Sequence, residues 1–456
     1  MRIRKSLLAA AVTGLALMTT GVSAKVSEQE ATRLDNELTP VGAERAGNAD
    51  GTIPAWNPDF KPPANYVVGG KYVDPYPDDK PLFTITAKNA EQYRDKLTPG
   101  MLAMFKAYPD TFKMPVYPSR RDGSYSDYIL ESARKNATRS VLSEDQNNVL
   151  GAKGGTPFPI PQNAAEVVWN RMMNSSPVSF ERETVEAIVY RDGSMLLGGS
   201  NTIQYAPYYD PNVSLEEFED NDMPMLYRLV QSTAPTRNKG QSFLVHEYKE
   251  RTGSARKAWS YTPGVRRVRR APTIAFDTPQ GLGNWRTTDE SYGFNGSLEK
   301  YNWSLEGKKE IYIPYNNYKF ENAEVPFEDL LPKGHANPDY MRYEMHRVWV
   351  VKAELKDSER NVYKTRVLYF DEDSWAVVAT DQYDNRDTLW RTSLGLTVNT
   401  YDVQGIHSRT FFYHDLVSRE YFADGLFNTV PASKNNQDPR ALSFFSPATL
   451  RKLGVR

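Results

Sequence analysis

Four arginines stand almost side by side between Trp259 and Pro272, in the stretch Trp-Ser-Tyr-Thr-Pro-Gly-Val-Arg-Arg-Val-Arg-Arg-Ala-Pro. Pro263 and Gly264 predict a turn between two short strands, because proline presets φ and glycine accepts a positive φ. Side chains alternate across a strand, so two guanidinium groups would point to each face. We therefore expect two of them near the core, unless the strand is irregular. The four are Arg266, Arg267, Arg269 and Arg270.

A buried guanidinium group needs a carboxylate or an anionic ligand as its partner. Two interpretations of the four arginines remain open. In the first, they pair with acids on neighbouring strands and stiffen the sheet, as we also expect of Arg347. In the second, two of them bind an anionic head group or a partner protein, which guanidinium recognises through paired hydrogen bonds.

Residues that usually carry catalysis are sparse in this chain. It has no cysteine and five histidines, and it contains neither a His-Glu-x-x-His nor a Gly-x-Ser-x-Gly motif. We interpret Asp371, Glu372 and Asp373 as a solvated hairpin turn, with a calcium loop as the alternative. His346 alternates with charged residues and is interpreted as a solvent-facing strand residue. The sequence therefore predicts no enzyme, no metal site and no cofactor.

The first 24 residues have the pattern of a cleavable secretion signal. Arg2, Arg4 and Lys5 precede a mostly apolar run, and Val22-Ser23-Ala24 ends in small residues. We expect cleavage after Ala24 and a location in the periplasm, with association with the outer membrane as a further option. Removal of the signal takes away three of the 56 basic residues and none of the 57 acidic ones, and the resulting net charge near −4 argues against nucleic acid as a partner.

Three regions are expected along the chain: residues 1–24 as the signal, 25–160 as an arm with lid helices, and 161–456 as a β domain. Seven prolines between Gly51 and Leu82 exclude regular elements there, so this part is expected to be an extended arm over the body. Helices are predicted over 87–97, 99–107 and 125–136. Asn163 and Glu166 form a capping box that predicts another helix.

Strands dominate the prediction from about residue 180 onward. Alternating apolar residues separated by turn signals at hairpin spacing are typical of a large antiparallel sheet, which must curl or split at this size. We predict a mainly β fold, with helices packed on or plugging the concave face. Aromatic and methionine side chains on apolar strand faces are either ordinary core or the walls of a ligand cavity. These cavity candidates are Trp259, Tyr261, Tyr343, Met345 and Trp349.

Several motifs resemble those of the DUF1329 family of Gram-negative bacteria across nearly the whole mature chain. They are Leu38-Thr-Pro-Val-Gly42, Gly51-Thr-Ile-Pro-Ala-Trp56, the arginine stretch 263–272, Ile313-Pro-Tyr-Asn316, His346-Arg-Val-Trp349 and Tyr369-Phe-Asp-Glu-Asp-Ser-Trp375. The resemblance implies a fold similar to the lipoprotein carriers LolA and LolB, an unclosed antiparallel β-barrel with a helical lid over an apolar cavity. It also implies partners among porin-like outer-membrane proteins and inner-membrane exporters of the resistance–nodulation–division type. This chain is about twice as long as those carriers and adds the aromatic N-terminal part.

Two functions follow from these observations. One is a periplasmic carrier or chaperone for a hydrophobic cargo, such as a lipid, a lipoprotein acyl chain, a terpenoid or a sterol, exchanged with an outer-membrane partner. The other is a non-catalytic adaptor in a transport complex. Cavity volume distinguishes them, because a carrier needs a pocket of roughly 300–1,000 Å³ and an adaptor should be filled.

Overall fold

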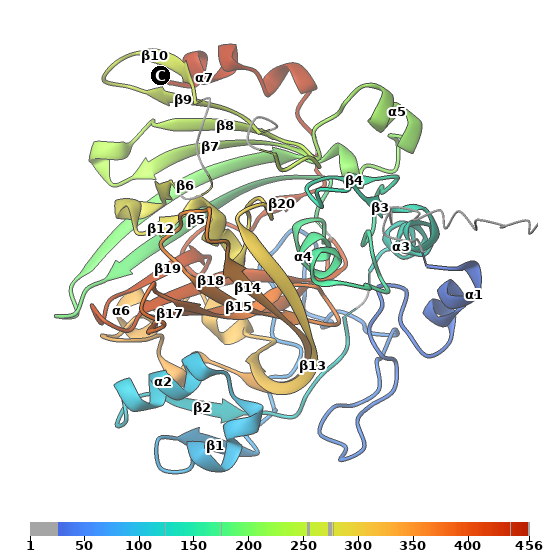
Figure 1. The fold of residues 1–456 in the computed structure, drawn as a ribbon. Helices are drawn as coiled ribbons and strands as arrows, with labels where there is room; N and C mark the ends of the chain where they lie inside the picture. Colours follow the sequence, from blue (N-terminus) through green and yellow to red (C-terminus); the bar gives the residue numbers. More distant parts are fainter. Residues whose placement is uncertain are drawn as a thin grey trace, which may run out of the picture.

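The computed structural model describes residues 26–123, 125–174, 176–252, 256–271, 276, 278–437 and 439–454. The expected secretion signal lies outside these residues. Within them, sixteen strands form one large sheet in the order β1-β2-β14-β15-β16-β17-β18-β19-β5-β6-β7-β8-β9-β10, with β13 paired to β14 and β20 paired to β5. The contact between β2 and β14 is parallel, and the other pairings are antiparallel. The path ends at β1 and β10 without closing, so the fold is mainly β with an open, mostly antiparallel sheet (Figure 1).

The strand bounds follow the predicted alternation from about residue 180 onward. In chain order the strands of the large sheet are β1 (Phe83–Thr86), β2 (Lys113–Val116), β5 (Ser179–Val189), β6 (Met195–Tyr205), β7 (Leu226–Ala234), β8 (Ser242–Glu247), β9 (Lys257–Thr262), β10 (Arg267–Arg270), β13 (Tyr301–Pro314), β14 (Tyr343–Leu355), β15 (Thr365–Asp371), β16 (Val377–Tyr383), β17 (Leu389–Thr400), β18 (Gly405–Asp415), β19 (Tyr421–Leu426) and β20 (Lys434–Asn435). Two small sheets pair β3 (Val141–Leu142) with β4 (Val149–Leu150), and β11 (Pro279–Gln280) with β12 (Arg286–Thr287).

Helices are short and lie around the sheet. The α-helices are α1 (Glu28–Ala31), α2 (Pro99–Ala107), α3 (Asp127–Arg139), α4 (Ala164–Met172), α5 (Leu215–Asp220), α6 (Phe327–Leu330) and α7 (Pro447–Gly454). Three 3₁₀ segments matter for the argument, namely η2 (Ala90–Lys96), η5 (Leu282–Asn284) and η6 (Thr288–Gly293). None of the helices in the described ranges is long and apolar enough to cross a bilayer.

Alternate residues of the central strands point into two different cores. On β15, Leu368 and Phe370 pack with α4, whereas Tyr369 between them packs with α2. Phe411 and Phe412 of β18 divide in the same way. We name the two sides of the sheet the α4 face and the α2 face. Both are covered over β14–β19, which explains why nearly every residue of these strands is buried.

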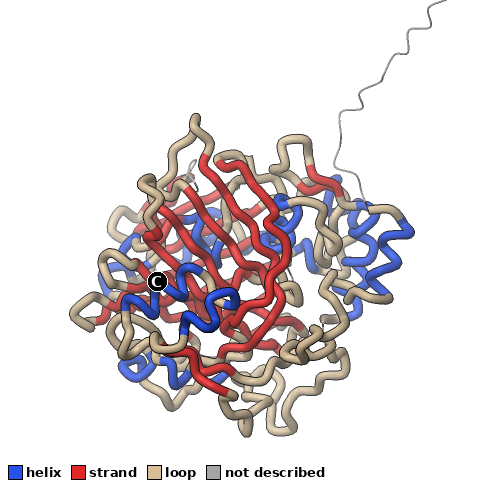
Figure 2. Tube along the Cα trace, turned by 60° about the horizontal axis from the view of Figure 1, so that its bottom comes forward, coloured by secondary structure: helices blue, strands red, loops and turns tan. Residues whose placement is uncertain are grey.

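The strands β5–β10 form the other half of the sheet, which we call the wing (Figure 2 shows the sheet as a red layer between helices and loops). On its α2 face, Leu450 of the C-terminal helix α7 packs onto Leu229, Leu244 and Tyr261. Neither face of the wing is completely covered, and many side chains of β6, β7 and β9 keep accessible surface. The two halves of one sheet therefore differ in burial.

Helix prediction succeeded where local signals are strong. The helix over 99–107 has the predicted bounds, with Thr98 as its N-cap and proline at its first position. Asn163 caps α4 by accepting a hydrogen bond from the Glu166 amide, and the Glu166 side chain accepts from the Gln162 amide. The segment 87–97 forms the 3₁₀ segment η2 instead of an α-helix.

The proline-rich segment has no regular element in the structure between residues 54 and 82. It lies against the body, where the Trp56 indole donates to the Gly123 carbonyl at 2.8 Å. Further along, Tyr66 and Tyr72 pack around Tyr401 with ring centroids 5.0 and 5.4 Å apart. Aromatic anchors thus hold a segment that proline keeps out of helices and strands.

Candidate functional site

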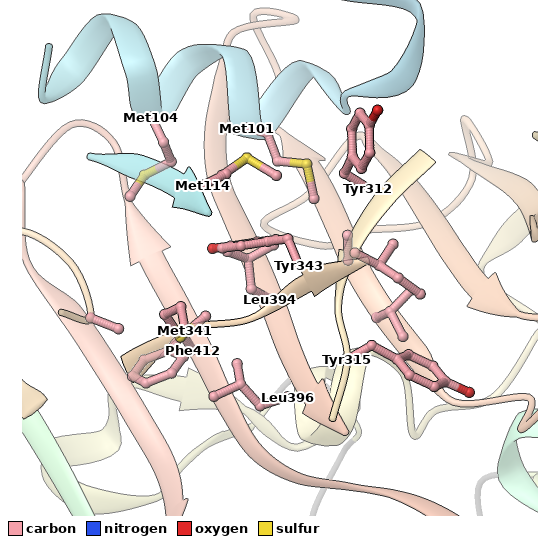
Figure 3. Packing of buried hydrophobic residues seen from close by; sticks show 14 of the residues in the cluster. Met101, Met104, Met114, Tyr312, Tyr315, Met341, Tyr343, Leu394, Leu396 and Phe412 are labelled. Atoms are coloured by element: carbon pink, nitrogen blue, oxygen red, sulfur yellow. The ribbon is translucent and has the colours of Figure 1, made fainter. Parts of the chain in front are cut away.

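Helix α2 packs on the α2 face of β16 and β17 and forms a lid on it (Figure 3). Met101 and Met104 point from the helix towards Met114 of β2, with Leu394 of β17 below them (Figure 3). Methionine side chains are flexible and fill irregular gaps, so they tolerate small shifts between a helix and a sheet. The layer beneath α2 is therefore apolar and adaptable.

Gly100 allows α2 to approach the sheet this closely. A Cβ atom at this position would lie 1.9 Å from the Thr392 hydroxyl oxygen and 2.2 Å from a carboxylate oxygen of Asp381. Asp381 also accepts hydrogen bonds from Thr392 at 3.1 Å and from the Tyr369 hydroxyl at 3.2 Å. Burial raises the pKa of this carboxyl to about 7, against the opposing effect of these donors. A titratable group thus lies directly under the start of the lid.

A cleft of about 520 Å³ opens where η2 and α2 meet β13 and β15. Its volume falls within the range of roughly 300–1,000 Å³ that is typical of small-molecule sites. Apolar side chains and charged side chains of both signs line it, which gives an amphipathic wall. The lining residues are Arg94, Asp95, Lys96, Leu97, Pro99, Leu102, Lys309, Glu310, Ile311 and Tyr369.

The cavity candidates from the sequence do not meet in one place. Tyr343 and Met345 belong to the core beneath α2, whereas Trp349 packs on the α4 face, with its ring 6.3 Å from that of Trp375. Trp259 and Tyr261 lie in the wing under α7. Tyr343 lines a separate cavity of about 10 Å³, which has room for about one water molecule. The cleft residues were not singled out from the sequence.

The four strand arginines lie differently from the expectation of two near the core. All four are exposed, because β10 is a short strand at the end of the sheet. Arg266 precedes the strand, with φ at 51°, and does not take part in the alternation. No ion pair joins any of the four to a carboxylate in the described part of the chain.

The turn at 371–373 is buried, so the interpretation as a solvated turn was wrong. Arg121, which follows β2, donates from Nε and Nη2 to the two Asp373 carboxylate oxygens at 2.8 and 2.7 Å. Arg347 donates to Glu372 at 3.0 Å, which confirms the expectation that this arginine pairs with an acid. Lys308 contacts the same carboxylate at 2.8 Å. The same arginines donate to backbone carbonyls of residues 44–54, which we call the N-terminal segment, so the turn holds this segment through them.

His346 is also buried, contrary to its interpretation as a solvent-facing residue. Its ring stacks on Tyr315, 3.8 Å between centroids, and its Nε2 lies 3.1 Å from a Glu344 oxygen. His346, Asp371 and Asp373 each bring one potential ligand atom within 4.8 Å of the others. Because both Asp373 oxygens already accept hydrogen bonds from Arg121, we assign this cluster to holding the N-terminal segment.

A second set of arginines, which sequence reasoning missed, lies on the α4 face of the wing. Arg182 belongs to β5, Arg228 to β7, and Arg171 reaches this region from α4. Each keeps part of its surface accessible. No local sequence signal separates them from ordinary surface arginines, because each stands alone between unlike neighbours.

Comparison with known proteins identifies relatives along the whole chain. The uncharacterized protein PA3922 of Pseudomonas aeruginosa is 41% identical over 460 residues, which covers 100% of both chains. Among solved structures, a DUF1329 family protein from Desulfovibrio piger is 12% identical, covers 62% of this chain and 96% of its own, and has a TM-score of 0.42. A LolA superfamily protein from Nitrosomonas europaea is 12% identical, with coverages of 63% and 98% and a TM-score of 0.35.

A family model described as "Protein of unknown function (DUF1329)" matches residues 84–451. This match covers most of the chain and confirms the resemblance seen in the motifs. The chain belongs to the DUF1329 family.

Proposed function

We propose that this protein is a periplasmic carrier that binds a hydrophobic cargo in the cleft beside α2 and exchanges it with an outer-membrane partner. The observation that carries the proposal is the cleft of about 520 Å³, which has an amphipathic wall and lies next to a methionine-rich layer. The cargo class is a lipid, a lipoprotein acyl chain, or another apolar compound such as a terpenoid or sterol.

Apolar burial provides enough free energy for reversible binding. Each CH₂ group removed from water contributes about 0.8 kcal/mol, so a single acyl chain is held firmly but can still be released. Leu97, Leu102 and Ile311 supply the apolar contacts, and the charged lining residues suit a polar end of the cargo. Transfer then needs only a partner with a better apolar site.

The lid offers a way to enlarge the cleft. Helix α2 rests on Met101 and Met104, whose side chains adopt new rotamers at low cost. Displacement of the helix would add the apolar layer beneath it, which includes Met114 and Leu394, to the cleft (Figure 3). A cargo longer than the closed cleft is accommodated in this way.

One observation favours the adaptor as a second candidate function. The exposed arginines of β10 and of the turn before it form a basic edge at the end of the sheet. Such an edge suits docking to an acidic partner in a transport complex through electrostatic steering. Porin-like proteins and exporters of the resistance–nodulation–division type, which the family resemblance implied, are the partners to test.

Native mass spectrometry with lipid extraction, on protein purified from a periplasm without detergent, tests the carrier. We expect a bound mass that extracts into organic solvent. Leu102→Arg, which places a charge in the cleft wall, should abolish it, whereas the matched Leu197→Arg, on the exposed part of β6, should retain it. A clean apo mass after incubation with lipids and terpenoids, or unchanged cargo in a folded Leu102→Arg variant, would contradict the proposal.

A further inference from the structure

On the α4 face of the wing, one arginine lies on each side of strand β6. The register places Arg182 of β5 opposite Thr202 of β6, and Gln204 of β6 opposite Arg228 of β7. Because directly paired residues share a face and every second residue points to the same side, the four side chains lie together on this face. Arg171 approaches from α4 and donates to the Tyr292 carbonyl in η6 at 3.0 and 3.1 Å.

None of the three arginines has a carboxylate partner among the described residues. The Nε and Nη2 atoms of Arg228 both donate to the side-chain oxygen of Gln204, at 3.0 and 2.7 Å. Arg182 has no hydrogen bond from its buried Nε, and its guanidinium lies 4.3 Å from the ring centroid of Phe180. The three arginines therefore contact neutral oxygens and an aromatic ring, and none of these partners carries a negative charge.

The neighbouring carboxylates are already paired with other arginines. Glu247 contacts both Arg251 and Arg256. Asp424 pairs with Arg286 at 3.1 Å, and Glu321 binds Arg409 through two hydrogen bonds. Asp424 and Glu247 therefore attract Arg182 and Arg228 only at longer range, and no carboxylate of the described residues forms an ion pair with Arg171, Arg182 or Arg228.

The three positive charges are also close enough to repel each other. Burial lowers the pKa of Arg228, and the charges of Arg182 and Arg256 lower it further. Burial, together with Arg251 and Arg228, lowers the pKa of Arg171 to about 10. Burial likewise lowers the pKa of Arg182, with a further contribution from Arg409. A partly desolvated guanidinium without an ion-pair partner is unfavourable, so an anion bound here would stabilise the folded protein.

We propose that Arg171, Arg182 and Arg228 form a binding site for an anionic group, a carboxylate or a phosphate, between α4 and the wing. Guanidinium groups bind both through paired, charge-assisted hydrogen bonds, and Thr202 adds a hydroxyl on the same face. The site is on the opposite face of the sheet from the cleft beside α2 and does not depend on the carrier function. The anion is either a small solute or the head group of an amphiphile.

Isothermal titration of the mature protein tests the site with inorganic phosphate, dodecyl phosphate and the neutral dodecanol. We expect one of the two phosphates to bind, with the affinity falling by about tenfold or more in Arg182→Gln and in Arg228→Gln. Arg267→Gln, on the exposed strand β10, is the matched control and should bind as the wild type does. Tight binding of inorganic phosphate identifies a small-solute site, and binding of dodecyl phosphate alone identifies a head-group site. Dodecanol binding should be the same in all variants, whether or not it occurs.

Thermal unfolding separates anion binding from a structural role. The anion should raise the Tm of the wild type but not that of Arg182→Gln. Without the anion, Arg182→Gln should be as stable as the wild type or more stable, because it removes a charge that has no ion-pair partner. The proposal is overturned if neither phosphate binds, if Arg182→Gln and Arg228→Gln retain the wild-type affinity, or if Arg267→Gln loses as much affinity as they do.

Discussion

The two halves of the sheet differ in the partners of their arginines. In the half built from β14–β19, both faces are covered, and the buried arginines Arg121 and Arg347 each meet a carboxylate of the 371–373 turn. In the wing, coverage is incomplete, and Arg182 and Arg228 form no ion pair with a carboxylate of the described residues. Ion pairs thus hold Arg121 and Arg347 in the packed half, whereas Arg182 and Arg228 of the wing lack such a partner and are the arginines available to an anionic ligand.

The largest effect is expected where the packed half holds the N-terminal segment. Arg121→Ala should lower the free energy of unfolding by about 3–5 kcal/mol, because it leaves the buried Asp373 carboxylate without its partner. Urea-induced unfolding measures the loss. Arg182→Ala in the wing is the contrasting variant and should cost far less. Similar losses in both variants would break the distinction between the two halves.

Matched phenylalanines test whether the halves also differ in packing. Phe412 of β18 is fully buried, whereas Phe243 of β8 is 37% exposed. Phe412→Ala should lower the free energy of unfolding by about 3–5 kcal/mol through the lost contacts and the cavity left behind. Phe243→Ala should cost about 1 kcal/mol or less, because much of its surface is already in contact with water. Chemical unfolding measures both losses, and equal m-values for the two variants would allow their free energies of unfolding to be compared directly.

The pH dependence of stability tests whether the Asp381 carboxyl is buried beneath α2 in the packed half. Because burial raises the pKa of Asp381 to about 7, the folded protein holds a proton that the unfolded chain releases above its ordinary value of 3.8. Stability should therefore fall as pH rises from about 4 to 7, by up to about 1.4 kcal/mol per pH unit from this group. Below pH 4 the group is protonated in both states and has no effect.

Asp381→Asn should remove this part of the pH dependence. The variant should match the wild type near pH 4 and exceed its stability at pH 8, as measured by thermal unfolding across this range. Asp110→Asn, at an exposed position after α2, is the control and should follow the wild-type profile. Parallel profiles for the wild type and Asp381→Asn would show that the carboxyl under α2 titrates normally.

The fold could be predicted from the sequence where information is local. Each signal depends on only a few neighbouring residues: the alternation of the strands, the proline at the start of α2 and the capping box of α4. The burial of the 371–373 turn was not accessible in this way, because Asp373 meets Arg121 across 252 residues. A run of acidic residues in a hairpin is therefore predicted to be solvated unless a basic partner distant in the sequence is known.

Local sequence also failed to identify which arginines belong to a candidate site. The sequence drew attention to Arg266 and its neighbours because four arginines in five positions are conspicuous, yet the end of the sheet leaves them exposed. Arg182 stands between two glutamates and looks compensated, but alternation sends both acids to the other face. Buried Arg121 and Arg347 do pair with carboxylates, as the sequence argument requires, and only the topology shows which arginines are buried.

The smallest effect is expected at the outer strand of the wing. Arg269→Gln and Arg270→Gln should each change the free energy of unfolding by no more than about 0.5 kcal/mol, because both side chains are exposed and have no carboxylate partner in the described residues. Arg347→Gln in β14 provides the contrast, since it removes the buried partner of Glu372. A loss above about 1 kcal/mol for either wing variant would mean that these arginines are compensated in solution after all. The lack of an ion-pair partner would then no longer distinguish the wing from the packed half, and the argument for an anion site would rest on Arg171, Arg182 and Arg228 alone.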